Sequence, residues 1–235
     1  MDAEFSAKVY LATTWIIPAL LAITLHEAAH GYAAWRLGDD TAMRMGRVTF
    51  NPLKHVDPFG TILLPALLIA SPLPFVFGYA KPVPVAMHRL HRPRRDMILV
   101  AAAGPGANIM IALVSAIMLR MTPLLPGASA DWLTYNLFNS ILLNLLLAIF
   151  NMLPLPPLDG GRVAVCLLPQ PLAHWLARLD RYGLIILIAA LFVLPVGLKF
   201  LGSSLDPFDF LIWGPIEWLL PYFLDLGGLA TRSAA

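Results

Sequence analysis

The chain carries little charge for its length. Only 13% of its 235 residues are Asp, Glu, Lys or Arg, whereas soluble domains carry roughly a quarter. Hydrophobic residues make up 59% of the sequence. This balance predicts a single membrane-embedded domain over residues 1–235, with the lipid bilayer as its main surroundings. The formal net charge of +2 is too small to indicate a nucleic-acid partner.

Cysteine is almost absent. The single Cys166 excludes an internal disulfide framework and any metal site that needs several thiolates. A metal site in this chain would therefore have to use histidine and carboxylate ligands. The first ten residues carry both signs of charge and lack a basic leader, so no cleavable signal peptide is expected.

Long apolar runs are abundant. A helix needs about 20 apolar residues to cross a bilayer. Five runs meet this requirement, at 9–35, 97–120, 134–155, 182–200 and 208–225. A sixth run, 60–77, contains three prolines, which break helices, so it either spans the membrane or enters it and turns back. The predicted fold is an all-α polytopic membrane protein with five or six transmembrane helices.

The loops differ sharply in positive charge. Lys and Arg gather in residues 36–59, 78–96 and 156–181, whereas residues 121–133 contain none. Because cytoplasmic loops carry the excess of Lys and Arg, this distribution favours a re-entrant 60–77 and an N-terminus outside the cytoplasm. The flanking segments 44–50 and 79–85 have extended, proline-punctuated patterns, which predict a small membrane-associated β element.

One motif lies inside the first apolar run. His26, Glu27 and His30 form the pattern H-E-x-x-H, in which the two histidines lie four residues apart on one helix face. Two histidines, one carboxylate and a water form a known catalytic zinc set. Glu27 could then act as general base. Chance could also produce this pattern, but ionisable groups inside a membrane helix are costly and usually functional.

The third ligand is expected from a distant segment. Asp159 follows the run N-M-L-P-L-P-P-L after the apolar segment 134–155. It could be a simple turn residue, because Asp-Gly pairs are common in turns. The charge distribution favours a ligand instead, since it makes segments 9–35 and 134–155 run in the same direction. His26, His30 and Asp159 would then lie at a similar depth, towards the cytoplasmic side.

Three patterns together resemble the site-2 protease family of intramembrane metalloproteases. They are HEAAH, the pattern N-x-x-P-x-P-x-L-D-G from Asn151 to Gly160, and G-P-x-x-N from Gly104 to Asn108. The segments GRVTFNPLKHVDPFG and GYAKPVPV are similar to a compact bacterial branch of that family without a PDZ or nucleotide-sensing domain. The resemblance implies one Zn²⁺ per chain, held by His26, His30 and Asp159, with Glu27 as the catalytic acid and base.

The resemblance also implies the type of substrate. The family cleaves membrane-embedded segments of proteins during regulated proteolysis, so a transmembrane protein substrate in a bacterial inner membrane is expected. Regulation of the kind that added domains provide in this family is expected either to come from a membrane partner or to be absent. Substrate, trigger and oligomeric state are not specified by the sequence.

Two asparagines have alternative interpretations. Asn151 could hydrogen-bond the scissile carbonyl or its oxyanion, or it could be an amide that packs helices together. Asn108 has the same two interpretations. Asn144 is expected to serve packing. His55, in a loop, is expected to be a hydrogen-bonding group instead of a catalytic one.

Two rival functions remain open. A non-catalytic zinc protein or carrier would need a fourth ligand or further polar residues along a path, and the sequence offers few of either. A zinc hydrolase that acts on a small or lipid substrate would use the same chemistry. Cleavage of a single-span protein substrate, with and without chelator, separates these possibilities.

Overall fold

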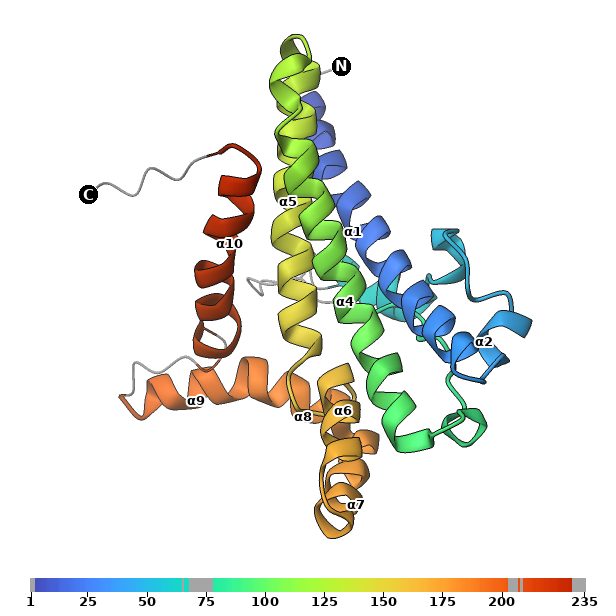
Figure 1. Ribbon diagram of the computed structural model, residues 1–235. Coiled ribbons are helices and arrows are strands. Elements are labelled where there is room, and N and C mark those ends of the chain that lie inside the picture. Colours follow the sequence, from blue (N-terminus) through green and yellow to red (C-terminus); the bar gives the residue numbers. More distant parts are fainter. Residues whose placement is uncertain (1–2, 65, 68–77, 203–206, 208, 230–235) are drawn as a thin grey trace.

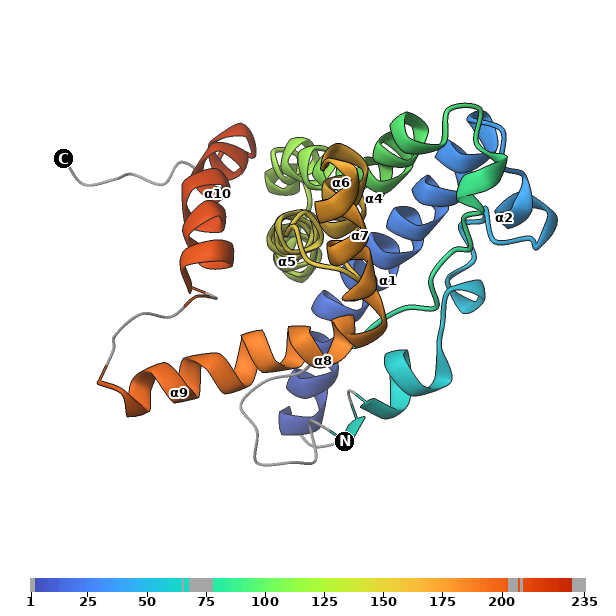
Figure 2. The same cartoon turned by 90° about the horizontal axis from the view of Figure 1, so that it is seen from below.

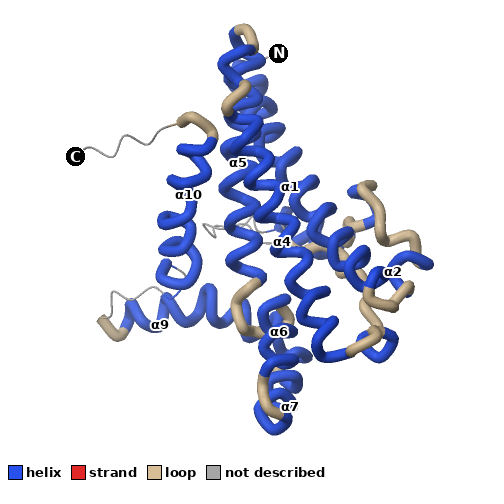
Figure 3. The backbone as a smooth tube through the Cα atoms, in the orientation of Figure 1, coloured by secondary structure: helices blue, strands red, loops and turns tan. Residues whose placement is uncertain are grey.

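The computed structural model describes residues 3–64, 66–67, 78–202, 207 and 209–229. Helices dominate these residues, and none of them forms a strand (Figure 3). The prediction of a β element is therefore wrong for the described parts of 44–50 and 79–85. Residues 48–50 form bends and residues 79–85 lack regular structure. Most of the run 60–77 lies outside the described residues, so its path stays a prediction.

Three long helices form the centre of the molecule. They are α1 (Ala3–Arg36), α4 (Pro93–Leu119) and α5 (Gly127–Asn151). Among the described residues, these three are long and apolar enough to cross a membrane. At 1.5 Å per residue, even α5 is about 38 Å long, which exceeds a hydrocarbon core of about 30 Å.

The three helices pack side by side (Figure 1). α1 and α5 run in the same direction and α4 runs against them, because η4 (Thr122–Leu124) joins α4 to α5 at the end where α1 begins. The sequence-based expectation that segments 9–35 and 134–155 run parallel is confirmed.

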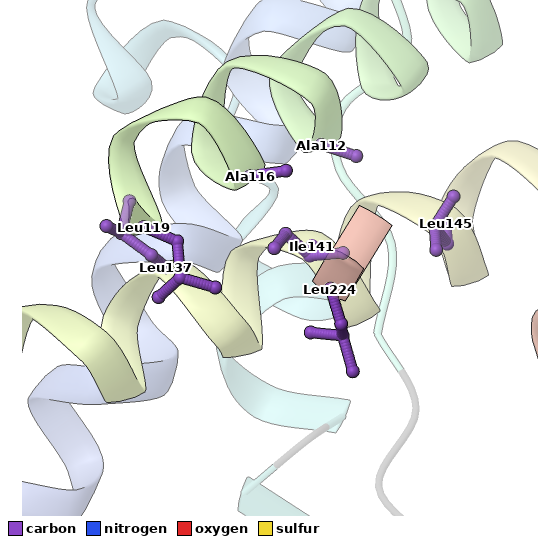
Figure 4. Close-up of a cluster of buried hydrophobic side chains, with 7 residues drawn as sticks. All are labelled: Ala112, Ala116, Leu119, Leu137, Ile141, Leu145 and Leu224. Atoms are coloured by element: carbon purple, nitrogen blue, oxygen red, sulfur yellow. The ribbon is translucent and has the colours of Figure 1, made fainter. Parts of the chain in front are cut away.

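Small side chains allow close approach between these helices. Ala112 and Ala116 of α4 are completely buried against Ile141 and Leu145 of α5, with Leu224 on the outer side (Figure 4). In lipid the helices gain little from the hydrophobic effect, so close packing and interhelical hydrogen bonds hold them together. Small residues at the contact serve that purpose.

Short elements connect α1 to α4. They are α2 (Thr41–Arg44), η1 (Pro52–Lys54), η2 (Pro58–Leu63) and η3 (Met87–Arg89). Asp57 caps η2 by accepting hydrogen bonds from the N–H groups of Phe59 and Gly60. α2 and η1 pack against α1, and η3 packs against α4 (Figure 1).

The chain after α5 turns into α6 (Asp159–Leu167) and α7 (Gln170–Arg178). Helical segments then follow as η5 (Asp180–Tyr182), α8 (Gly183–Ile188), η6 (Ala189–Val193), α9 (Leu194–Phe200), η7 (Asp209–Trp213) and α10 (Gly214–Leu226). The segments α8 to α9 extend sideways from the bundle, and α10 stands beside α5 (Figures 1 and 2). The predicted spans at 182–200 and 208–225 are thus helical, but neither forms one long regular α-helix within the described residues.

Candidate metal centre

The structure brings three buried donor groups together from two distant segments. His26 and His30 lie on α1, and Asp159 begins α6. Oδ2 of Asp159 is 3.3 Å from Nε2 of His26 and 3.2 Å from Nε2 of His30, and the two Nε2 atoms are 3.0 Å apart. All three residues are at most 8% exposed. We call this set the donor cluster.

The spacing of these atoms fits a zinc ion. Zinc binds histidine nitrogen and carboxylate oxygen at about 2.0–2.1 Å in tetrahedral geometry, which sets ligand atoms roughly 3.3 Å apart. The three measured edges, between 3.0 and 3.3 Å, are close to that value. The donor cluster supplies three protein ligands, which leaves a fourth tetrahedral position for water, as in catalytic zinc sites.

The hydrogen bonds behind the histidines support the same conclusion. Nδ1 of His30 lies 2.7 Å from the carbonyl oxygen of Val100, which can only accept. Nδ1 of His26 lies 2.5 Å from Oδ1 of Asn108. Both Nδ1 atoms therefore carry the proton, so in the neutral rings both Nε2 lone pairs point at each other and at a carboxylate. A metal ion among these acceptors, or a proton on one Nε2 atom when no metal is bound, satisfies this convergence.

The backbone approaches the cluster closely at Gly104 of α4. A Cβ atom added there would collide with the imidazoles of both His30 and His26. Gly160 and Gly161 are equally confined, because a Cβ atom at either would collide with backbone of the loop after α5. The glycine of the G-P-x-x-N pattern therefore brings α4 against the histidines, and the glycines of L-D-G-G let α6 pack against the loop after α5.

Electrostatics keep Asp159 ionised. Burial raises the pKa of the Asp159 carboxyl, but a proton on Nε2 of His26 or His30, which donates a hydrogen bond to the carboxylate when no metal is bound, outweighs burial and holds that pKa below its usual range. The charged form is the one that binds a metal.

Glu27 lies beside the cluster and is held by backbone. Its Oε2 accepts a hydrogen bond of 2.7 Å from the N–H of Val83, in the segment before α4. Glu27 is half-buried, in contrast to its two histidine neighbours. A carboxylate with one anchored oxygen and partial access to solvent can exchange protons with a nearby water.

The two asparagines of the sequence analysis occupy different places. Asn108 is completely buried and contacts His26, so it orients a ligand. Its Nδ2 donates to Oδ1 of Asn144 at 2.7 Å, and Asn144 in turn donates to the carbonyl of Ser140. Asn144, for which we expected a packing role, thus supports the histidine from behind. The sequence carried no signal for this link, because the two asparagines come from different helices.

Asn151 lies at the end of α5. Its Nδ2 donates to the carbonyl of Leu147 within the same helix at 2.9 Å, and the residue is half-buried. No hydrogen bond among the described residues joins it to the donor cluster. Its role towards a substrate carbonyl stays a prediction.

Sequence reasoning missed two charged residues that contact the same segment as Glu27 does. Asp39 and Arg47 are buried and hydrogen-bond the backbone of residues 81–86. His55 is also buried, with Nε2 3.1 Å from the carbonyl of Thr49, and it stands outside the donor cluster. The sequence offers one weak signal for Asp39 and Arg47, namely that these charged residues lie between two apolar runs.

Three apolar helices around a buried cluster of two histidines and one carboxylate define a membrane protein with a metal site. The chain is 39% identical to "Putative zinc metalloprotease YwhC" of Bacillus subtilis over 210 residues, which cover 88% of this chain and 92% of that protein. It is 29% identical over 217 residues to "Putative zinc metalloprotease Rip2" of Mycolicibacterium smegmatis, covering 91% of this chain and 77% of the relative. A Rip2 protein of the same description from Mycobacterium tuberculosis is also 29% identical over 217 residues, covering 92% of this chain and 74% of the relative.

The chain belongs to this family of zinc metalloproteases. Zinc is therefore its cofactor, in agreement with the donor cluster. No model of a protein family matches the sequence, and no solved structure matches it significantly.

Proposed function

We propose that the protein is an intramembrane zinc endopeptidase of the site-2 type, which hydrolyses peptide bonds in or near transmembrane segments of other proteins. The observation that carries this proposal is the position of the donor cluster. It is buried between helices long enough to cross a bilayer, and it offers three ligands instead of four. A substrate for such a site must reach it from within or beside the membrane.

His26, His30 and Asp159 are the proposed zinc ligands. When bound, zinc would supply a water molecule of nearly neutral pKa and polarise a carbonyl group. Asn108 and the carbonyl of Val100 fix the imidazoles, so that Nε2 of each faces the metal position. A carboxylate and two neutral imidazoles leave the zinc centre with a net positive charge.

Glu27 is the proposed general base and acid. It would take the proton of the attacking water and deliver it to the leaving amine. Asn151 is the candidate for a contact with the developing oxyanion, through the second N–H of the amide group that donates to the carbonyl of Leu147.

A helical substrate hides its carbonyls in its own hydrogen bonds, so cleavage requires local unwinding. The excess of Lys and Arg in loops at the same end of α1 supports an opening towards the cytoplasm of a bacterial inner membrane.

Reconstitution tests the proposal. The purified chain is placed in liposomes with a tagged single-span protein, and the products are mapped by mass spectrometry. Cleavage within or beside the span is expected, with loss of cleavage after chelation and recovery when zinc is restored. Zinc binding without cleavage of any single-span substrate would contradict the proposal and favour a zinc carrier. Hydrolysis of small amides or esters alone would favour a hydrolase of another class.

A further inference from the structure

The segment Lys81–Ala86 crosses the side of α1 that carries Glu27. It has no regular secondary structure, and Pro82 and Pro84 lack backbone N–H groups. The N–H of Val83 between them is therefore the only backbone donor of residues 82–84, and it donates to Oε2 of Glu27. The Val83 side chain is buried, with Cγ1 3.2 Å from where a Cβ of Gly31 would stand. We call residues 81–86 the strap.

One end of the strap is held by a buried cation. Arg47 is only 6% exposed, and its Nη2 donates to the carbonyl of Lys81 at 2.6 Å and to that of Pro82 at 3.4 Å. Among the described residues no carboxylate pairs with it. A buried guanidinium whose partners are carbonyls is costly. That cost is difficult to explain by stability alone, because an apolar residue would fill the space at a lower cost.

The other end of the strap is held by a buried anion. Asp39 is fully buried, and its Oδ2 accepts from the N–H of Ala86 at 2.5 Å. Its Oδ1 accepts from the N–H of Thr41 at 3.0 Å, which fixes the carboxylate just after the end of α1. The neighbouring Asp40 is different, because it pairs with Arg44 and Arg89 on the surface.

The two anchors lie on either side of the donor that reaches Glu27. Arg47 holds residues 81 and 82, Asp39 holds residue 86, and Val83 lies between them. The prolines on both sides of Val83 restrict the backbone further. Displacement of either anchor would therefore move the Val83 N–H relative to the carboxylate. The strap also lines a cavity of about 480 Å³ together with Pro156 and Arg162, so whatever fills that cavity contacts it.

We propose that Asp39 and Arg47 are positioning residues for the reaction, which act through the strap by holding the Val83 N–H against Glu27. The proposal rests on the proposed function in one respect, namely that Glu27 is the general base. A misplaced base lowers turnover and leaves the zinc ligands intact. Displacement of about 1 Å at a reacting group can reduce turnover about 100-fold.

Two matched comparisons test this on the intact chain. Val83→Pro removes the N–H, whereas Val83→Ala shortens the buried side chain and retains the N–H. Asp39→Ala and Arg47→Ala remove the anchors, whereas Asp40→Asn and Arg44→Ala alter neighbouring surface charges. We expect about 10- to 100-fold lower kcat for Val83→Pro, Asp39→Ala and Arg47→Ala than for their controls, with KM within about twofold and one zinc per chain.

Double variants provide the decisive readout. If both anchors act through the same hydrogen bond, adding Asp39→Ala or Arg47→Ala to Val83→Pro lowers kcat no further. Multiplicative losses, loss of zinc, or unchanged kcat in the single variants would overturn the proposal, because each outcome indicates a general structural role or none.

Hydrogen exchange gives a readout that does not depend on proteolysis. The Val83 amide should exchange faster in Asp39→Ala, Arg47→Ala and Glu27→Ala than in wild type or Asp40→Asn. Unchanged protection of this amide in the anchor variants would overturn the proposal whether or not the enzyme cleaves a substrate. If the Val83 amide exchanges faster in the anchor variants but the protein cleaves no substrate, the result supports the role of the strap and contradicts the proposed function.

Discussion

Gly104 offers a sharp test of the donor cluster because the space for a side chain there is occupied by the proposed ligands. Replacement with alanine adds a single methyl group, which would overlap the imidazoles of His30 and His26. His30 cannot retreat freely, since its Nδ1 is bonded to the carbonyl of Val100 on the same helix as Gly104. Either the rings must rotate or α4 must move away from α1.

The size of the effect follows from overpacking. An extra methyl group in a tightly packed site costs typically about 1–3 kcal/mol. If this strain falls on the metal-bound form, zinc affinity drops about 5- to 150-fold, since about 1.4 kcal/mol corresponds to a factor of ten. Perturbation of groups that orient metal ligands usually costs about 10- to 100-fold, which is the same range.

The assay is competition for zinc with a chromophoric chelator in detergent. Gly106→Ala is the matched control, because a Cβ at this position of the same helix meets no atom within 4 Å. We expect Gly104→Ala to bind zinc at least about tenfold more weakly than Gly106→Ala, with equal helical content by circular dichroism. Equal zinc affinity in the two variants would refute the arrangement of α4 against the histidines.

Three further outcomes are expected. Asn108→Ala should weaken zinc binding about 10- to 100-fold, and Asn144→Ala should weaken it less, because Asn144 reaches His26 only through Asn108. Equal zinc affinities in both variants and wild type would contradict this. Gly161→Ala should lower the Tm, because its Cβ would collide with the preceding loop, and an unchanged Tm would count against that packing. Burial raises the pKa of Asp39, but hydrogen bonds from Thr41 and Ala86 outweigh it, so the folded pKa lies below the usual 3.8. The ionised Asp39 carboxylate should stabilise the fold fully above about pH 3.8, and this stabilisation should fade as the pH falls through the pKa of the folded protein. The difference in unfolding free energy between wild type and Asp39→Asn should therefore shrink in acid. A difference that grows in acid would contradict this sign.

The long helices and the donor cluster could be predicted because their signals are local or cumulative. About twenty apolar residues identify a spanning helix without knowledge of its neighbours. The H-E-x-x-H pattern sets two ligands on one helix face, and loop charge orients the helices so that Asp159 falls nearby. The close approach of these three residues in the structure agrees with that reasoning.

The supporting residues could not be predicted because their roles depend on contacts between distant segments. Asn144 is 36 residues from Asn108, and Asp39 is 47 residues from Ala86. The extended pattern of 79–85 indicated a strand, but its prolines remove the donors that a ladder requires, and side chains hold the segment instead. An extended chain without a β partner gives the same sequence pattern as an edge strand.

The most direct test of the central claim compares zinc content and proteolysis in Glu27→Gln and Glu217→Gln. Glu217 is exposed on α10, so its variant controls for loss of one acidic charge. We predict one zinc per chain in both proteins, with cleavage of a single-span substrate retained in Glu217→Gln and abolished in Glu27→Gln. Full cleavage by Glu27→Gln would contradict the account.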